Sequence, residues 1–222
     1  MILPLEKIST YYTKSASRIQ GGAHGKAGNI SSHFNSLNLQ PPVPPFVGTT
    51  VRVSIPDDSL TFGFVNLVLA DGSESFTIDW GDGSVQAFAA DADHATHEYP
   101  HGGNCEIKIS DGVSSIQLSG SSSRDPDYYN VYAPMVQSVA SNGARLTTIQ
   151  ANGFRHCVNL TSAAFQTVSV VNGRSGTVPF NECDALTEIH FAAVHEEAIK
   201  ETSAYKADPP FGAPNATVYF DL

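Results

Sequence analysis

The stretch GFRHCVNLTSAAF, residues 153–165, returns 26 positions later as PFNECDALTEIHF, residues 179–191. Five identities share that offset: Phe154, Cys157, Leu160, Thr161 and Phe165 match Phe180, Cys183, Leu186, Thr187 and Phe191. A weaker earlier copy runs through PMVQSVA (134–140) and RLTTIQ (145–150). A period of this size predicts repeats that stack, so that equal positions lie over one another and form a continuous core.

Within each copy we expect a short strand at LTSAAF or LTEIHF, with the Phe and Cys of the preceding turn facing inward. The segment AAVHEEAIKETSAY (192–205) predicts a helix, and FGAPNATVYFDL (211–222) predicts a final strand. The residues expected to face inward from the helix are Ala193, Ala198 and Ile199. A helix and strand of this kind would cap the end of a stack.

The F-x-x-C-x-x-L-T pattern, over about residues 134–192, resembles the BspA-type leucine-rich repeats of bacterial surface and phage-associated proteins. The chain has only two clear copies of it. The resemblance therefore implies a short, atypical leucine-rich-repeat-like solenoid with a C-terminal helix and strand cap.

Upstream of the repeat, short alternating segments are separated by Gly-, Asp- and Ser-rich turns. They are TTVRVSI (49–55), FGFVNLVL (62–69), SFTIDW (75–80), SVQAFAA (84–90), CEIKIS (105–110) and SSIQLSG (114–120). In FTIDWGDGSVQAF (76–88), Phe76, Ile78 and Trp80 share one face, and Asp82 lies in a tight turn. Closely spaced strands of this kind predict a β-sandwich.

The combination of IDWGDGS (78–84), THEYPHGG (96–103) and CEIKISDG (105–112) resembles the PKD-type immunoglobulin-like domain over roughly residues 49–120. The commoner family form has another residue before GDG, so the resemblance is to a divergent branch. It implies an adhesion or spacer module on a cell or particle exterior, and not an enzyme.

The first 45 residues have few large apolar side chains and end in PPVPP. A segment of this composition buries too little surface to fold alone. We therefore divide the chain into an extended N-terminal arm with a Pro-rich linker (1–45), a PKD-like β-sandwich (46–120) and a solenoid with cap (121–222). The fold class is mostly β.

Charge is unevenly distributed between the arm and the body. The arm has four basic residues and one acidic residue, a charge of +3, so the total of −10 leaves −13 on the rest. Such a body repels phosphates and anionic lipid, which argues against nucleic acid and membrane partners. The opening MILPLEKIST does not have the pattern of a signal peptide, so we expect a phage particle or a nonclassical route to the cell exterior.

Several clusters invite a chemical interpretation. His94, His97 and His101 with Asp91 and Asp93 could suggest a metal site, and a calcium site would use Asp79, Asp82, Asp91 and Asp93. Cys157 beside His156 could suggest a thiol nucleophile. Glu196, Glu197 and Glu201 could suggest paired carboxylates. We favour a structural or solvated role for each, with the histidines in a loop and both repeat cysteines in the core. We expect no catalytic residue, metal or cofactor.

The junction SGSSSRDPDYYNVYAP (119–134) has the Tyr- and Ser-rich composition of recognition loops. Its candidate ligand-binding residues are Arg124, Asp125, Asp127, Tyr128, Tyr129 and Tyr132. The alternative is that the tyrosines cover the first repeat of the stack.

These features together predict a non-enzymatic binding or adhesion protein, associated with a phage or prophage particle as a tail or receptor-binding accessory component. Its partners would be a host-surface glycan or protein receptor, and a particle or neighbouring subunit through the arm. The alternatives are an exported bacterial surface adhesin and a glycan-directed hydrolase.

Overall fold

The computed structural model describes residues 45–119, 131–174 and 176–222. Residues 46–222 form one compact unit. Its described residues are mostly β structure, with two mixed sheets and one short α-helix, which confirms the expected fold class at that level. Apart from Pro45, the predicted arm lies outside the described residues.

The first seven strands are β1 (Gly48–Ile55), β2 (Thr61–Leu69), β3 (Phe76–Asp79), β4 (Val85–Phe88), β5 (Ala92–Glu98), β6 (Gly103–Ser110) and β7 (Val113–Gln117). The next six are β8 (Val136–Ser141), β9 (Thr148–Ile149), β10 (Ser162–Phe165), β11 (Val170–Val171), β12 (Glu188–Phe191) and β13 (Thr217–Phe220). The helical elements are the 3-10 turns η1 (Ala133–Met135), η2 (Ala193–His195) and η3 (Pro210–Gly212), and the helix α3 (Glu196–Lys200).

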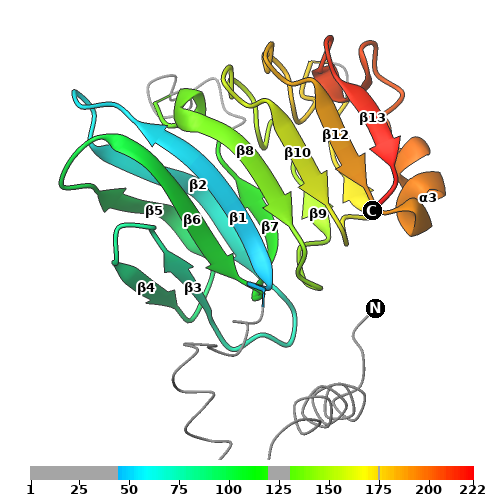
Figure 1. The fold of residues 1–222 in the computed structure, drawn as a ribbon. Helices are drawn as coiled ribbons and strands as arrows, with labels where there is room; N and C mark the ends of the chain where they lie inside the picture. The colour runs from blue at the N-terminus through cyan, green and yellow to red at the C-terminus, as the bar shows by residue number, and fades with distance from the viewer. Residues whose placement is uncertain (1–44, 120–130, 175) are drawn as a thin grey trace, which may run out of the picture. The chain divides into compact units, whose positions relative to one another are not determined.

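Two sheets face each other (Figure 1). The long sheet has the order β13-β12-β10-β8-β1-β6-β3-β4, and the short sheet has the order β11-β9-β7-β2-β5. In the long sheet, β8 pairs antiparallel with β1 and parallel with β10. In the short sheet, β7 pairs antiparallel with β2 and parallel with β9. Both sheets therefore continue from the antiparallel strands into the parallel ones. The division into residues 46–120 and 121–222 stays a prediction.

The predicted hairpin at residues 76–88 is confirmed. Phe76, Ile78 and Trp80 are buried on one face, and β3 pairs antiparallel with β4. Asp82 Oδ1 accepts a hydrogen bond from the Ser84 N–H at 2.9 Å, as a turn aspartate does. Gly81 has φ +83°, and a Cβ there would lie 2.7 Å from the Glu106 carbonyl oxygen, so the position needs glycine.

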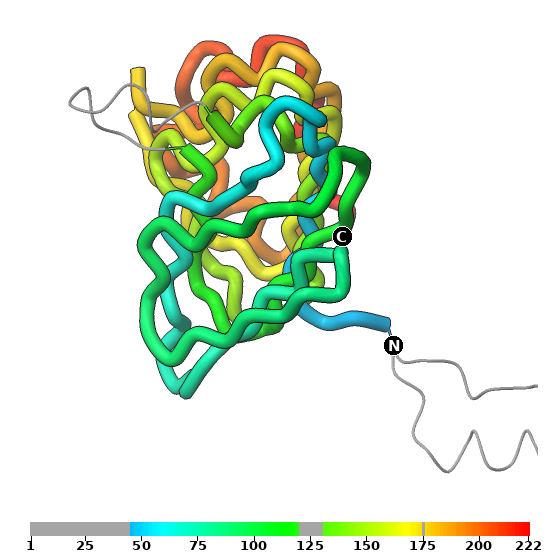
Figure 2. The backbone as a smooth tube through the Cα atoms, turned by 90° about the vertical axis from the view of Figure 1, so that its left-hand side faces the viewer, coloured from blue at the N-terminus to red at the C-terminus, as the bar shows by residue number. Residues whose placement is uncertain are grey.

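The predicted strands of the sequence repeat lie in register on neighbouring parallel strands. Ala163 pairs with Ile189, and Phe165 pairs with Phe191. The Thr of the L-T motif has a structural role: Thr187 Oγ1 donates to the Thr161 carbonyl at 3.1 Å, and Thr161 Oγ1 donates to the Gln137 carbonyl at 3.1 Å. Each repeat is therefore hydrogen-bonded to the one before it. In Figure 2 the yellow to red repeats lie behind the green antiparallel strands.

The inward positions of the repeat form a continuous aromatic core. The Phe154 and Phe180 rings stack with centroids 5.1 Å apart, and Phe165 stacks on Phe191 at 5.8 Å. The repeated Cys and Leu positions of both copies are also fully buried, as predicted: Cys157, Leu160, Cys183 and Leu186. Burial of such side chains contributes roughly 1.5–3 kcal/mol each.

The C-terminal helix is shorter than predicted. It covers only five residues, Glu196–Lys200, after the 3-10 turn η2. Ile199 is buried as expected, but Ala193 and Ala198 are exposed, which corrects that part of the prediction. Ala193 belongs to η2, so a single helical phase does not cover the segment. Among the described residues, no helix has the length and apolar character needed to cross a membrane.

Strand β5 corrects a second expectation. His94 and His97 lie on this strand and not in a loop. Ala92 and Ala95 provide its buried positions, and β5 pairs antiparallel with β2. The segment ADHATHE is polar enough that its two small apolar residues gave no clear strand signal.

Candidate functional site

A shallow trough lies on the outer face of the long sheet. Its volume is about 380 Å³. It crosses β6, β1, β8 and β10, which are neighbours in the front layer of Figure 1. The residues that line it are Thr50, Arg52, Glu106, Ser138, Val139, Ala140, Ser162 and Ala164.

The strand register arranges the outward side chains in two rows across the sheet. One row contains Glu106, Arg52, Ser138, Ser162 and Glu188, and the other contains Lys108, Thr50, Ala140, Ala164 and His190. The rows are two residues apart along each strand, about 7 Å. In these two rows, the side chains from β8 and β10 are only Ser and Ala, and larger side chains from β1 and β12 stand on both sides of them. The trough exists because these two strands carry small outward residues.

The arginine rim of the trough, residues Arg52, Glu106 and Lys108, is nearly balanced in charge. Arg52 Nε donates to Glu106 Oε2 at 3.1 Å, and Lys108 Nζ lies 3.6 Å from Glu106 Oε1. Asp79 is the cross-strand neighbour of Lys108. Two cations therefore stand beside two carboxylates.

The histidine rim lies one strand beyond β10 and consists of Glu188, His190, Tyr219 and Asp221. His190 Nδ1 is 2.8 Å from Asp221 Oδ1, and its Nε2 is 3.5 Å from Glu188 Oε2. The hydrogen bond with Asp221 raises the pKa of His190 above its usual value, against a smaller effect of partial burial and with help from Glu188. The Tyr219 ring stacks on the imidazole at 4.7 Å, with 15° between the planes.

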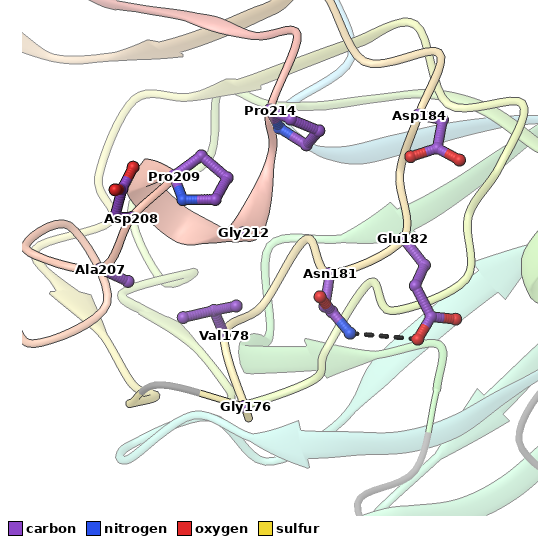
Figure 3. Close-up of a pocket in the computed structure, with 10 residues that line it drawn as sticks. All are labelled: Gly176, Val178, Asn181, Glu182, Asp184, Ala207, Asp208, Pro209, Gly212 and Pro214. Atoms are coloured by element: carbon purple, nitrogen blue, oxygen red, sulfur yellow. Dashed lines mark hydrogen bonds between the residues drawn. The ribbon is translucent and has the colours of Figure 1, made fainter.

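A second cavity of about 300 Å³ lies between the turn that precedes β12 and the loop that precedes β13. Figure 3 shows Asn181, Glu182 and Asp184 on one side of it and Asp208 and Pro209 on the other. Glu182 already accepts hydrogen bonds from Asn181 Nδ2 at 3.2 Å and from Arg155 at 2.7 Å. Asp184 and Asp208 are exposed to solvent. The cavity is acidic, but its most enclosed carboxylate is already paired.

The hairpin turn and β5 meet in a cluster of polar and aromatic groups. His97 Nε2 is 2.7 Å from Asp82 Oδ2, and the imidazole stacks on Trp80 at 5.1 Å. The Tyr99 hydroxyl donates to the Trp80 carbonyl at 2.9 Å. Partial burial acts to raise the pKa of Asp82, but the hydrogen bonds from His97 and Ser84 outweigh it and lower that pKa. These contacts fasten the turn to β5.

The other chemical candidates occupy structural positions. Over residues 45–119, 131–174 and 176–222, no three His, Cys, Asp or Glu side chains are grouped so as to hold a metal ion. Cys157 is fully buried, and burial, together with a hydrogen bond to Cys183, raises the pKa of its thiol. Glu196 and Glu201 pair with Lys200 and Lys206 at the surface.

Of the predicted recognition residues, only Tyr132 is described. It is half-buried, and its ring lies 5.9 Å from that of Phe62 on β2. Arg124, Asp125, Asp127, Tyr128 and Tyr129 lie outside the described residues. The assignment of these six residues to a ligand site stays a prediction.

Comparison with protein-family models, with curated proteins and with solved structures found no match to this chain.

The trough residues were not identified from the sequence. A signal was present in the repeat, because the outward positions are Ser162 and Ala164 in one copy and Glu188 and His190 in the next. A drop in side-chain size at outward positions marks a hollow only once the strands are known to be neighbours. The sequence alone does not show that β1 and β8 lie beside β10.

Proposed function

We propose that this protein is a non-enzymatic binding or adhesion protein, carried on a phage or prophage particle as a tail or receptor-binding accessory component. The observation that supports it best is the trough: an open, preformed hollow on the face of a sheet that is braced from behind by a second sheet. Its volume falls at the lower end of the range of small-ligand sites.

A finer description of the fold is part of this proposal. The antiparallel strands form a PKD-like sandwich, and the parallel repeats form a short leucine-rich-repeat-like solenoid with a cap. The stacked Phe pairs and the Thr-to-carbonyl bonds between repeats support the second assignment. Both module types hold a surface rigidly, which lowers the ordering cost of binding.

Two further parts of the chain would complete the function. The junction residues Arg124, Asp125, Asp127, Tyr128, Tyr129 and Tyr132 would add contacts to a host-surface receptor. The basic arm, residues 1–45, would attach the protein to the particle or to a neighbouring subunit. The body would then face the host from the exterior of the particle.

Binding is favoured over glycan hydrolysis by the arrangement of the trough carboxylates. A glycosidase holds two carboxyl groups about 5–9.5 Å apart across the scissile bond. Glu106 and Glu188 stand on opposite sides of the trough with three strands between them, and four strand spacings separate their chain positions by roughly 19 Å. Glu106 is also engaged by Arg52 and Lys108.

The test is to incubate the labelled full-length protein with a panel of intact bacterial cells and to measure saturable binding. The supernatants are assayed in parallel for released reducing sugar. Saturable binding without sugar release is the expected result. Absence of binding to every cell type would contradict the binding function, and sugar release would contradict the non-enzymatic assignment.

A further inference from the structure

We infer that the trough binds an uncharged saccharide, which lies along the strands over Ser138, Ala140, Ser162 and Ala164. This inference rests on the proposed binding function and names the class of ligand and the place where it binds. It depends on the floor, on the charges of the two rims, and on the ring of His190 beside the floor.

The floor allows a ring-shaped ligand to approach the sheet closely. Ser138 and Ser162 are neighbours in one row, and Ala140 and Ala164 are neighbours in the other. The hydroxyls can donate to or accept from sugar hydroxyls, and the methyl groups can contact the apolar C–H face of a sugar ring. The floor therefore alternates the two kinds of contact that a saccharide offers.

The charges of the two rims disfavour an acidic ligand. On the arginine rim, Arg52 and Lys108 share Glu106, and Lys108 has Asp79 as its cross-strand neighbour. On the histidine rim, His190 lies between Asp221 and Glu188. Four carboxylates, those of Asp79, Glu106, Glu188 and Asp221, therefore stand at the rims against Arg52, Lys108 and His190, and an acidic ligand would meet more carboxylates than cations. A neutral polyol can instead bond to the guanidinium and carboxylate groups while the pairs stay intact.

His190 lies between Ala164 on β10 and Tyr219 on β13. The Tyr219 ring covers one face of the imidazole. On the β10 side its cross-strand neighbour is Ala164, whose methyl group is too small to cover the other face of the ring. The His190 side chain is 24% exposed. The apolar body of the imidazole is therefore available to stack on a sugar ring at the edge of the floor.

Other macromolecular ligands fit this surface less well. A peptide that adds a strand needs a free strand edge, but β1, β8, β10 and β12 are each paired on both sides. The net charge of −10 opposes nucleic acid.

The experiment uses the full-length protein and three probes: an array of neutral and acidic oligosaccharides, intact bacterial cells, and the same cells after periodate oxidation of their sugar diols. The test variant is Ala164→Trp, which fills the floor from an outward position. Its matched control is Ala87→Trp, on the exposed edge strand β4 of the same sheet. A second test variant, His190→Ala, removes the ring face without adding bulk. Circular dichroism and the melting temperature check the fold of each variant.

We expect the wild type to bind neutral oligosaccharides and untreated cells. Its binding to the cells should be lost after periodate treatment. Ala164→Trp should weaken both interactions by at least about tenfold, and Ala87→Trp should leave them unchanged. His190→Ala should weaken binding by a smaller factor. The site assignment is overturned if Ala164→Trp and His190→Ala are both folded and both bind as the wild type does.

The failure of the saccharide inference is distinct from the failure of the proposed function. Cell binding that survives periodate, is lost after protease treatment of the cells and finds no partner on the array overturns the saccharide but leaves a binding protein. A preference for acidic oligosaccharides overturns the charge argument. A wild-type protein that binds neither cells nor array overturns both proposals together.

Discussion

The antiparallel half of the molecule, β1 to β7, and the parallel half, β8 to β13, share both sheets but are stabilised differently. In the antiparallel half, single contacts such as the Asp82–His97 pair hold particular turns in place. In the parallel half, each inward residue packs against its own counterpart one repeat away, as Phe154 does on Phe180. A stabilising contact in the first half is therefore made once, whereas in the second half it is repeated along the stack.

The largest effect is expected from Phe180→Ala, because Phe180 packs against Phe154, Phe165 and Phe211. The loss of unfolding free energy should be about 3–5 kcal/mol, measured by urea titration. Phe88→Ala removes one ring of the stacked Phe76–Phe88 pair at the sheet edge, where Phe88 is only partly buried, and should cost less.

The same titration tests whether the two halves unfold together. Trp80, in the antiparallel half, is the chain's single tryptophan. Because both sheets cross from one half to the other, its fluorescence and the circular dichroism signal should change at the same urea concentration, even in Phe180→Ala. Two separated transitions would show that the halves are independent.

The parallel half was the more predictable of the two from sequence. Phe154, Cys157 and Leu160 recur 26 residues later. Because a stack places equal positions over one another, this recurrence predicts that these side chains face inward. The pairing of β1 with β8 is different, since its partners Thr49 and Ser141 are 92 residues apart and share no motif. Strand β5 was hidden by its polar residues. The trough depends on which strands are neighbours, so its floor was not recognisable before the register was known.

The next largest effect is expected from loss of the Asp82–His97 contact in the antiparallel half. Asp82→Ala removes the acceptor for His97 and for the Ser84 N–H. Hydrogen bonds to a charged group contribute about 1.5–3 kcal/mol, so a loss in that range is expected at neutral pH. The pKa of Asp82 is lowered in the folded protein, so this contribution is present above the unfolded pKa and is lost as pH falls through the folded pKa. Urea titrations of wild type and variant at neutral and acidic pH should therefore converge toward low pH. A difference that is independent of pH would contradict the charged contact.

A smaller effect is expected at the end of the parallel half, in Asp221→Asn. Asp221 raises the pKa of His190, so the contact stabilises the fold fully below the unfolded His pKa of about 6.5, and this contribution is lost as pH rises through the folded pKa. Because Asp221 is largely exposed, the variant should lose less than about 1 kcal/mol, and only on the acidic side. The pKa of His190, followed by NMR titration, should fall in the variant. An unchanged titration would show that Asp221 does not set it.

The smallest effect is expected from chelation, which should leave both halves unchanged. Asp82 is engaged with Ser84 and His97, and the described residues form no group of metal ligands. EDTA should not shift the melting temperature. A clear decrease that calcium or zinc restores would show that Asp82 or the β5 histidines hold an ion.

The helix α3 has a consequence for how this architecture can change in length. It follows β12 and contacts β11, the end strand of the short sheet, while the long sheet continues to β13. Because the segment that ends the stack follows the last repeat in the chain, we expect that a further repeat could be inserted ahead of it. Duplicating residues 162–187 would widen the long sheet by one strand spacing, about 4.8 Å, and add another Ser and Ala to the floor of the trough. The number of repeats would therefore set the width of the trough.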